Sequence, residues 1–171
     1  MRLNYTLMSV GSEQVCLYYA FYSNNTNCQL TTLAIHASGV IECEGYQYRL
    51  EGIEELMKIG ILRTEIEEKE RVYIPEIASF IACDVLPIAK ETEVLNEIAD
   101  IIRELNGKPT TSDLCLSAYR RYLDAPTEEN RLQLKSAYEL MPKHLDCWLL
   151  GFDEKDVPIR KAIYGEAYKE H

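Results

Sequence analysis

The first half of the chain alternates short apolar runs with turn residues. Each run is rich in Val, Ile, Leu, Thr and Tyr, and Gly, Ser or Asn residues separate the runs. Apolar and polar positions alternate most clearly at Leu3, Tyr5 and Leu7, a pattern typical of strands with one covered face. The pattern predicts an antiparallel meander with strands at residues 3–10, 15–22, 29–36, 40–43 and 46–50.

Two further elements follow the predicted meander. Residues 53–59 have the composition of a short helix, and Gly60 would end it. After an acidic turn around residues 67–69, the run Arg71-Val72-Tyr73-Ile74 predicts another strand. The first half of the chain therefore contains one short helix among predicted strands.

Beyond residue 87 the apolar positions recur at helical spacing. Residues 91–105 place six apolar side chains on one stripe, with acidic residues in the first turn and Asn106-Gly107 at the end. Further helices begin near Ser112 and near Thr127, and the short connection between them predicts an antiparallel hairpin. A turn of helix is expected at residues 143–150, and a last helix is expected from Asp156 to about residue 164.

The two patterns together define a fold class and a division of the chain. They predict an α+β protein with an N-terminal antiparallel sheet packed against a C-terminal set of three to five helices. The change near Leu86-Pro87 divides the chain into a mainly β subdomain, residues 1–86, and a helical subdomain, residues 87–171. At 171 residues and 47% hydrophobic composition, the chain can bury a core without metal or disulfides, and we expect the two parts to pack as one unit.

The charge balance restricts the partners. The chain has 18 basic and 28 acidic residues, for a net charge of -10, which opposes attraction to nucleic acid and to anionic lipid. The start of the chain lacks the apolar core of a signal peptide, and the apolar run at residues 15–22 is shorter than a bilayer span. These features predict a soluble cytoplasmic protein with no nucleic-acid partner and no membrane partner.

The residues that usually carry catalysis form no recognisable motif. The six cysteines contain no Cys-x-x-Cys pair and are most simply small buried hydrophobic residues of a reducing compartment. His36, His144 and His171 do not stand at metal-ligand spacing, and no nucleophile elbow or phosphate-binding glycine loop is present. The sequence therefore identifies no catalytic residue, no metal ligand and no cofactor.

Tyrosine is the unusual component of the composition. The chain has 12 tyrosines, and Tyr18, Tyr22, Tyr46 and Tyr48 would project from adjacent strands of the meander. A tyrosine ring with its polar tip suits both core packing and binding surfaces, so both interpretations stay open. With His36 on a neighbouring strand, these four tyrosines form the predicted binding site.

Three functional hypotheses are compatible with these observations. The first is a non-catalytic protein-binding or regulatory module that contacts a protein partner or a second copy of itself. The second is a small enzyme or small-molecule binder with a site near the N-terminal sheet, built from His36, Tyr46 and carboxylates near Glu42. The third is an acidic inhibitor that mimics nucleic acid, which the net charge of -10 permits.

Overall fold

The chain folds into two compact units of different composition. The computed structural model describes residues 5–10, 13–24, 27–85, 90–141 and 157–165. One unit comprises Met1–Lys108 and the other Pro109–His171. The described strands all lie in the first unit, and helices alone make up the described part of the second, so the predicted α+β class is confirmed.

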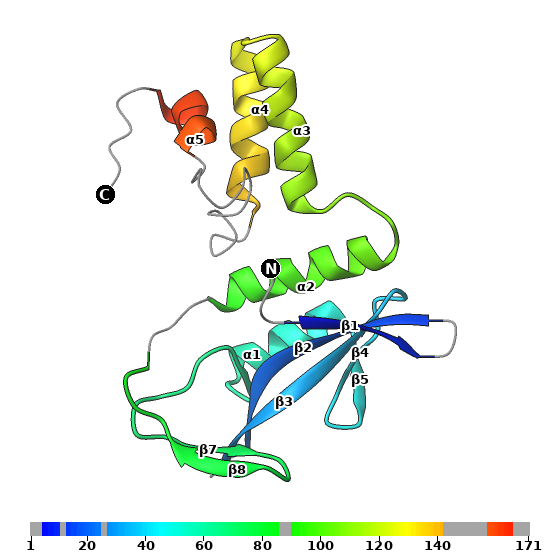
Figure 1. The fold of residues 1–171 in the computed structure, drawn as a ribbon, viewed down its shortest axis with the longest axis vertical. Helices are drawn as coiled ribbons and strands as arrows, with labels where there is room; N and C mark the ends of the chain where they lie inside the picture. Colours follow the sequence, from blue (N-terminus) through cyan, green and yellow to red (C-terminus); the bar gives the residue numbers. More distant parts are fainter. Residues whose placement is uncertain (1–4, 11–12, 25–26, 86–89, 142–156, 166–171) are drawn as a thin grey trace. The chain divides into compact units, whose positions relative to one another are not determined.

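A meander of five strands forms the centre of the first unit (Figure 1). Its two long strands pair through ten consecutive residue pairs, from Val15 with His36 to Asn24 with Asn27. The short strands extend the sheet on either side of this pair. The strands of the meander are β1 (Tyr5–Val10), β2 (Glu13–Asn24), β3 (Asn27–His36), β4 (Ile41–Cys43) and β5 (Tyr46–Tyr48).

Three further strands extend the sheet near the end of β2 and β3 where Asn24 pairs with Asn27. Strand β6 (Leu62–Arg63) pairs with β2 at Phe21 and Tyr22. Strand β7 (Arg71–Ile74) runs parallel to β3 beside Cys28, and β8 (Ala78–Ile81) forms an antiparallel hairpin with β7. Among the described strand pairs, β3 and β7 run parallel and all others are antiparallel. Through this pair, the β7–β8 hairpin is attached at the edge of the sheet.

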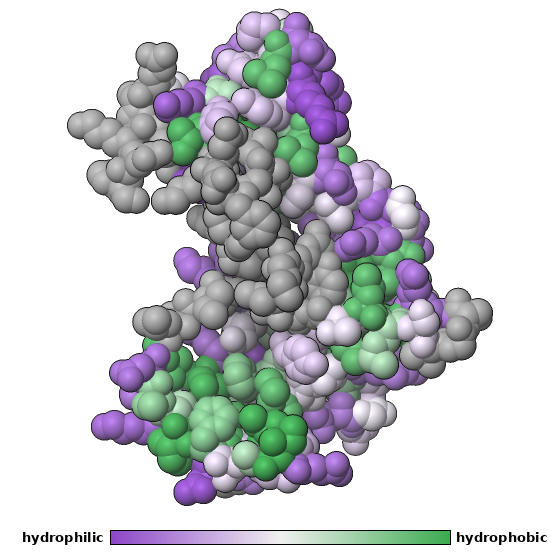
Figure 2. All heavy atoms as spheres, viewed as in Figure 1, coloured by the Kyte–Doolittle hydropathy of each residue, from purple (hydrophilic) through white to green (hydrophobic). Residues whose placement is uncertain are grey.

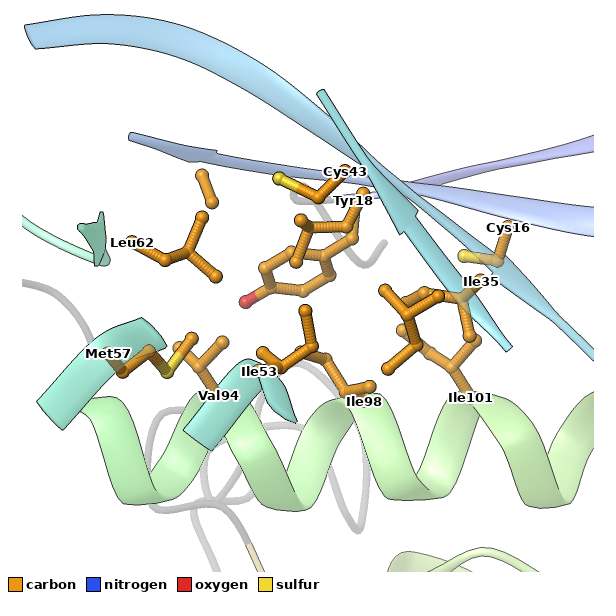
Figure 3. Packing of buried hydrophobic residues seen from close by; sticks show 13 residues of the cluster. Cys16, Tyr18, Ile35, Cys43, Ile53, Met57, Leu62, Val94, Ile98 and Ile101 are labelled. Atoms are coloured by element: carbon orange, nitrogen blue, oxygen red, sulfur yellow. The ribbon is translucent and has the colours of Figure 1, made fainter. Parts of the chain in front are cut away.

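Helices α1 (Leu50–Lys58) and α2 (Glu91–Leu105) cover one face of the meander. Helix α2 buries Val94, Ile98 and Ile101 at intervals of four and three residues, which places all three on one side of the helix. Figure 3 shows these side chains facing Tyr18 and Ile35 of the sheet. The buried members of this core are Cys16, Tyr18, Ala20, Leu33, Ile35, Ile41, Cys43, Ile53, Met57, Leu62, Val94, Ile98 and Ile101.

The second unit has its own apolar core. Helices α3 (Thr111–Asp124) and α4 (Glu128–Glu139) form the expected hairpin, and α5 (Val157–Tyr164) follows. Thr110 and Thr127 begin the first two helices, because each side chain accepts a hydrogen bond from the backbone three residues on. The buried members of this core are Cys115, Ala118, Leu134, Met141, Ile159 and Ile163.

The structure divides the chain after α2, whereas the change in sequence pattern lies near residue 86. Helix α2 belongs to the first unit because its apolar stripe is part of the core beneath the sheet. The helical turn expected at residues 143–150 and the capping residue Asp156 lie outside the described residues. None of the described helices has both the length and the apolar composition needed to cross a bilayer.

Candidate functional site

Large hydrophobic side chains are exposed along the β7–β8 hairpin. The exposed fractions are 46% for Tyr73, 79% for Ile77, 44% for Phe80 and 49% for Ile81. We call these four residues the hairpin surface. Figure 2 shows hydrophobic side chains gathered over this hairpin in the lower part of the view. A local group of exposed apolar side chains is typical of an interaction site.

Strand β8 has a free edge. Within the part of the chain that the structure describes, β8 pairs with β7 and with no other strand. The Ala82 N–H donates to the Glu70 carbonyl at 2.8 Å, so residue 82 directs its backbone groups toward the β7 side. Because these directions alternate along an antiparallel strand, Ser79 and Ile81 direct their N–H and C=O groups away from β7. These backbone groups are available to an additional strand.

A small core holds the base of the hairpin against the sheet. Val72 on β7 is fully buried and lies beside Cys28 on β3 in the parallel register. Ala82, just after β8, completes the buried part of this cluster. Phe21, Ile66 and Val85 pack against it from the surrounding segments. The base of the hairpin is therefore packed against the sheet, and the exposed side chains of the hairpin project from this packed base.

An ion pair links the hairpin to β6. Arg63 Nη2 lies 2.5 Å from Glu70 Oε1, and the Glu67 N–H donates to Glu70 Oε2 at 2.8 Å. Burial opposes ionisation of Glu70, but these two hydrogen bonds and the Arg63 charge outweigh it and lower the pKa of the Glu70 carboxyl. Glu70 therefore stays charged at neutral pH beside a charged Arg63.

Acidic residues stand at both ends of β8. The hairpin turns between Ile74 and Ile77, whose N–H donates to the Ile74 carbonyl at 3.1 Å. Glu76 occupies this turn with a φ of 59°, and Asp84 follows the hairpin with a φ of 55°. Both side chains are exposed. The exposed apolar strand thus has one carboxylate beyond each end.

The four predicted tyrosines do not form one exposed surface. Tyr18 is 2% exposed in the core, where its hydroxyl donates to Glu97 Oε2 at 2.9 Å. Tyr22 and Tyr48 are partly buried against the same core. Tyr46 on β5 is 68% exposed. Of these tyrosines, Tyr46 has the accessibility that a contact residue needs.

His36 lies between two carboxylates on the opposite face of the sheet from the helices. Its Nδ1 is 3.1 Å from Glu13 Oε1, and its Nε2 is 3.9 Å from Glu42 Oε2. Tyr46 pairs with the core residue Cys43, so alternation places Tyr46 on the other face from Glu42. The structure places His36 beside Glu42 and separates Tyr46 from both.

The cysteines of the described segments are mostly buried. Cys16, Cys28, Cys43 and Cys115 are buried, and Cys83 is exposed. Burial, helped by the nearby Glu44, raises the pKa of the Cys43 thiol to about 11. Burial also raises the pKa of Cys28. Among the described residues, no group of three or more His, Cys, Asp or Glu side chains is arranged to hold a metal ion.

The fold and this surface define a two-unit α+β protein with an exposed, apolar edge hairpin on its sheet. The chain belongs to the family described as Domain of unknown function (DUF7638), whose model matches residues 17–109. Residues 110–170 match a second model, Domain of unknown function (DUF7639). The junction between the two matches falls one residue beyond the structural division after Lys108. Searches of curated proteins and of solved structures gave no match.

The hairpin surface was missed at the level of sequence. The run from Ile77 to Ile81 contains three large apolar residues directly after the predicted strand at residues 71–74. A second strand that closes a hairpin would have been the natural interpretation of this run. The sequence could not show that these side chains stay exposed, because exposure depends on which elements pack over them.

Proposed function

We propose that this protein is a non-catalytic protein-binding module and that the hairpin surface is its contact site. The observation that carries the proposal is the exposure of Tyr73, Ile77, Phe80 and Ile81 on one hairpin. Fully burying an exposed large apolar side chain contributes roughly 1.5–3 kcal/mol. Three of these four side chains are about half exposed, so each contributes part of that amount, and a partner that covers several of them still gains a useful part of a binding free energy. A regulatory role through such binding belongs to the same proposal.

The fixed base of the hairpin supports the proposal. Val72 and Cys28 are buried beneath it, and Arg63 holds Glu70 at the start of β7. A surface that is ordered before binding loses less conformational entropy when the partner docks. The exposed side chains are therefore presented on a pre-organised element.

The thiols support a non-catalytic function over a cysteine-based one. Cys28 and Cys43 are buried, and burial raises the pKa of both, so neither is a thiolate at neutral pH. A catalytic cysteine needs the opposite environment, with a lowered pKa and access to solvent. Among the described cysteines, Cys83 is the exposed one, so a reagent in solution can reach its thiol directly.

The test is partner capture from the natural host with matched surface variants. We expect the double variant Ile77→Ser, Phe80→Ser to lose its specific partners by about tenfold or more, because truncated contact residues at an interface centre cost that much. Leu123→Ser is the matched control, since Leu123 is 60% exposed on α3 in the other unit. Quantitative mass spectrometry of crosslinked complexes would measure the loss, and urea denaturation would confirm that each variant is folded.

Tyr46→Ser provides the comparison with the surface predicted from the sequence. Capture that is unchanged by the hairpin variant and lost with Tyr46→Ser would move the contact site to β5. Capture that is equally reduced by Leu123→Ser would also contradict the proposal. Loss confined to the hairpin variant would support it.

A further inference from the structure

We infer that the partner presents an extended segment that adds to the free edge of β8, with apolar residues in its centre and Lys or Arg at both ends. This inference rests on the proposed function of the hairpin surface and deepens it by naming the chemistry of the partner. The occupant is a strand of a different protein. A second copy of this chain fits the same edge less well, for reasons of charge.

The backbone supplies the first argument. Ser79 and Ile81 direct their N–H and C=O groups away from β7, as the bond from the Ala82 N–H to the Glu70 carbonyl indicates. An extended segment beside β8 would pair with both residues and continue the ladder by one strand. Addition of a strand to an exposed sheet edge is a recurring mode of peptide recognition.

The side chains supply the second argument. Phe80 pairs with Val72 across the hairpin, so both lie on one face, whereas Ile81 pairs with Arg71 and lies on the other face with Tyr73. Both Phe80 and Ile81 are close to half exposed. A segment added to β8 would have apolar neighbours on both faces, so consecutive apolar residues at its centre would each gain a contact.

The charges supply the third argument. Glu76 and Asp84 stand beyond the two ends of β8 and both are exposed. Lys69 and Arg71 lie on the β7 side, one strand further from the free edge. A bound segment would therefore meet a carboxylate near each of its ends, and basic residues at those positions would be favoured.

The same charges oppose pairing with a second copy. A two-fold antiparallel pair centred on Phe80 would place Ser79 opposite Ile81 of the other copy. The same register would bring Glu76 of one copy toward Asp84 of the other, beyond both ends of the paired strands. Like charges directly opposite one another destabilise a strand pair, and each copy carries a net charge of -10. In this register the edge therefore fits a basic-flanked strand better than its own counterpart.

The experiment selects peptides with the full-length protein and compares two substitutions at one position. The probe is a phage-displayed library of random 12-residue peptides. We expect the enriched peptides to have a central apolar run with Lys or Arg on both sides. Ser79→Pro removes one outward N–H while leaving the β7 side of the hairpin intact, and it should weaken binding of these peptides at least tenfold. Ser79→Ala keeps the N–H and should bind as the original chain does.

The charge component has its own readout. Glu76→Gln combined with Asp84→Asn should weaken binding of the selected peptides several-fold, by about threefold for each pair removed. The same loss should appear in the original chain when the salt concentration is raised to a level that screens exposed charges. Thermal denaturation of every variant would check that the fold is retained.

Several outcomes would overturn the inference. These are a library without enriched peptides, enriched peptides with acidic ends, and equal binding by Ser79→Pro. A concentration-dependent dimer that Ser79→Pro abolishes in sedimentation would assign the edge to a second copy instead. Cellular capture that is lost with Ile77→Ser, Phe80→Ser but unaffected by Ser79→Pro would keep the proposed function and reject strand addition. Capture unaffected by both would reject both.

Discussion

Arg63 of β6 and Glu70, the residue before β7, form an ion pair with 2.5 Å between Nη2 and Oε1. The two side chains are 19% and 21% exposed, so the pair is largely shielded from water. The ion pair joins β6, which pairs with β2, to the start of the β7–β8 hairpin, which pairs with β3. The candidate contact surface is thereby connected to both long strands of the sheet.

Removing the charge of Glu70 should weaken this connection in a pH-dependent way. Glu70→Gln should lower the free energy of unfolding at pH 7 by about 1–3 kcal/mol, because it leaves the partly buried Arg63 with only the more distant and exposed Glu67 carboxylate. The pKa of Glu70 is lowered in the folded state, so its stabilisation is complete above the unfolded value near 4.5. That stabilisation disappears as the pH falls through the lower, folded value.

Urea denaturation of both proteins at a series of pH values from 7 to about 3 would measure this difference. Glu76→Gln is the control, since Glu76 is an exposed carboxylate on the same hairpin. A difference between the original chain and Glu70→Gln that stays constant at acidic pH would contradict the assigned role of the carboxylate.

Tyr18 should stabilise the core through its hydroxyl as well as its ring. Tyr18→Phe keeps the ring and removes the donor to Glu97 Oε2, leaving a buried carboxylate with one hydrogen bond fewer. We expect the free energy of unfolding to fall by about 1–3 kcal/mol. Tyr19→Phe is the control, because Tyr19 is exposed on the opposite face of the same strand. Equal stability of the two variants would mean that the buried hydroxyl contributes nothing net.

Thr110 should determine how well α3 begins. Its side chain accepts a hydrogen bond from the Asp113 N–H, and Asp113 Oδ2 accepts from the Thr110 N–H at 2.9 Å. Thr110→Ala should cost about 1 kcal/mol and increase amide hydrogen exchange in the first turn of α3. Ser117→Ala, at an exposed position within the same helix, should leave exchange in that turn unchanged. Increased exchange in both variants would point to a general loss of stability.

The described thiols should react with very different rates. The pKa of about 11 at Cys43, against an ordinary 9.0, lowers its thiolate fraction at pH 7.5 about 100-fold before burial restricts access further. Iodoacetamide should therefore modify the exposed Cys83 first, and Cys43 only after denaturant is added. Peptide mass spectrometry over time would resolve the sites, with Cys83→Ser as the control. Rapid labelling of Cys43 in the native protein would contradict its burial.

Local patterns in the sequence were sufficient for most of the individual elements. The predicted helix at residues 91–105 has the same bounds as α2, because its stripe, its acidic first turn and its terminal Asn106-Gly107 all agree. The predicted strand at residues 71–74 is confirmed as β7. Such elements are determined by residues within a few positions of one another.

Long-range packing could not be predicted in the same way. The sequence did not indicate that β7 would run parallel to β3, because this pairing joins residues 44 positions apart, such as Cys28 and Val72. The two-residue strand β6 is too short to leave a pattern of its own. The assignment of α2 to the sheet unit likewise depends on which surface its stripe covers.

The predicted site shows the same limit. The four tyrosines lie on strands of the meander, but these strands, β2 and β5, are separated by β3 and β4 and are not adjacent as predicted. The choice between core and surface depended on where α1 and α2 lie. Tyr18 faces these helices and is buried, whereas Tyr46, the first residue of the short strand β5, is exposed. A binding role for Tyr18, Tyr22, Tyr46, Tyr48 and His36 remains a prediction.

The ten-pair ladder between β2 and β3 has a consequence for the order in which the sheet assembles. Its closest pair, Asn24 with Asn27, is three residues apart, and its most distant pair, Val15 with His36, is 21 residues apart. The partners that add to its edges, β6 and β7, come from 40 or more residues away. Because closing a longer loop costs more entropy, we expect the β2–β3 ladder to form early and to act as the template for both. Until β2 and β3 have paired, the strand edge of β3 to which the β7–β8 hairpin binds would therefore not be in place.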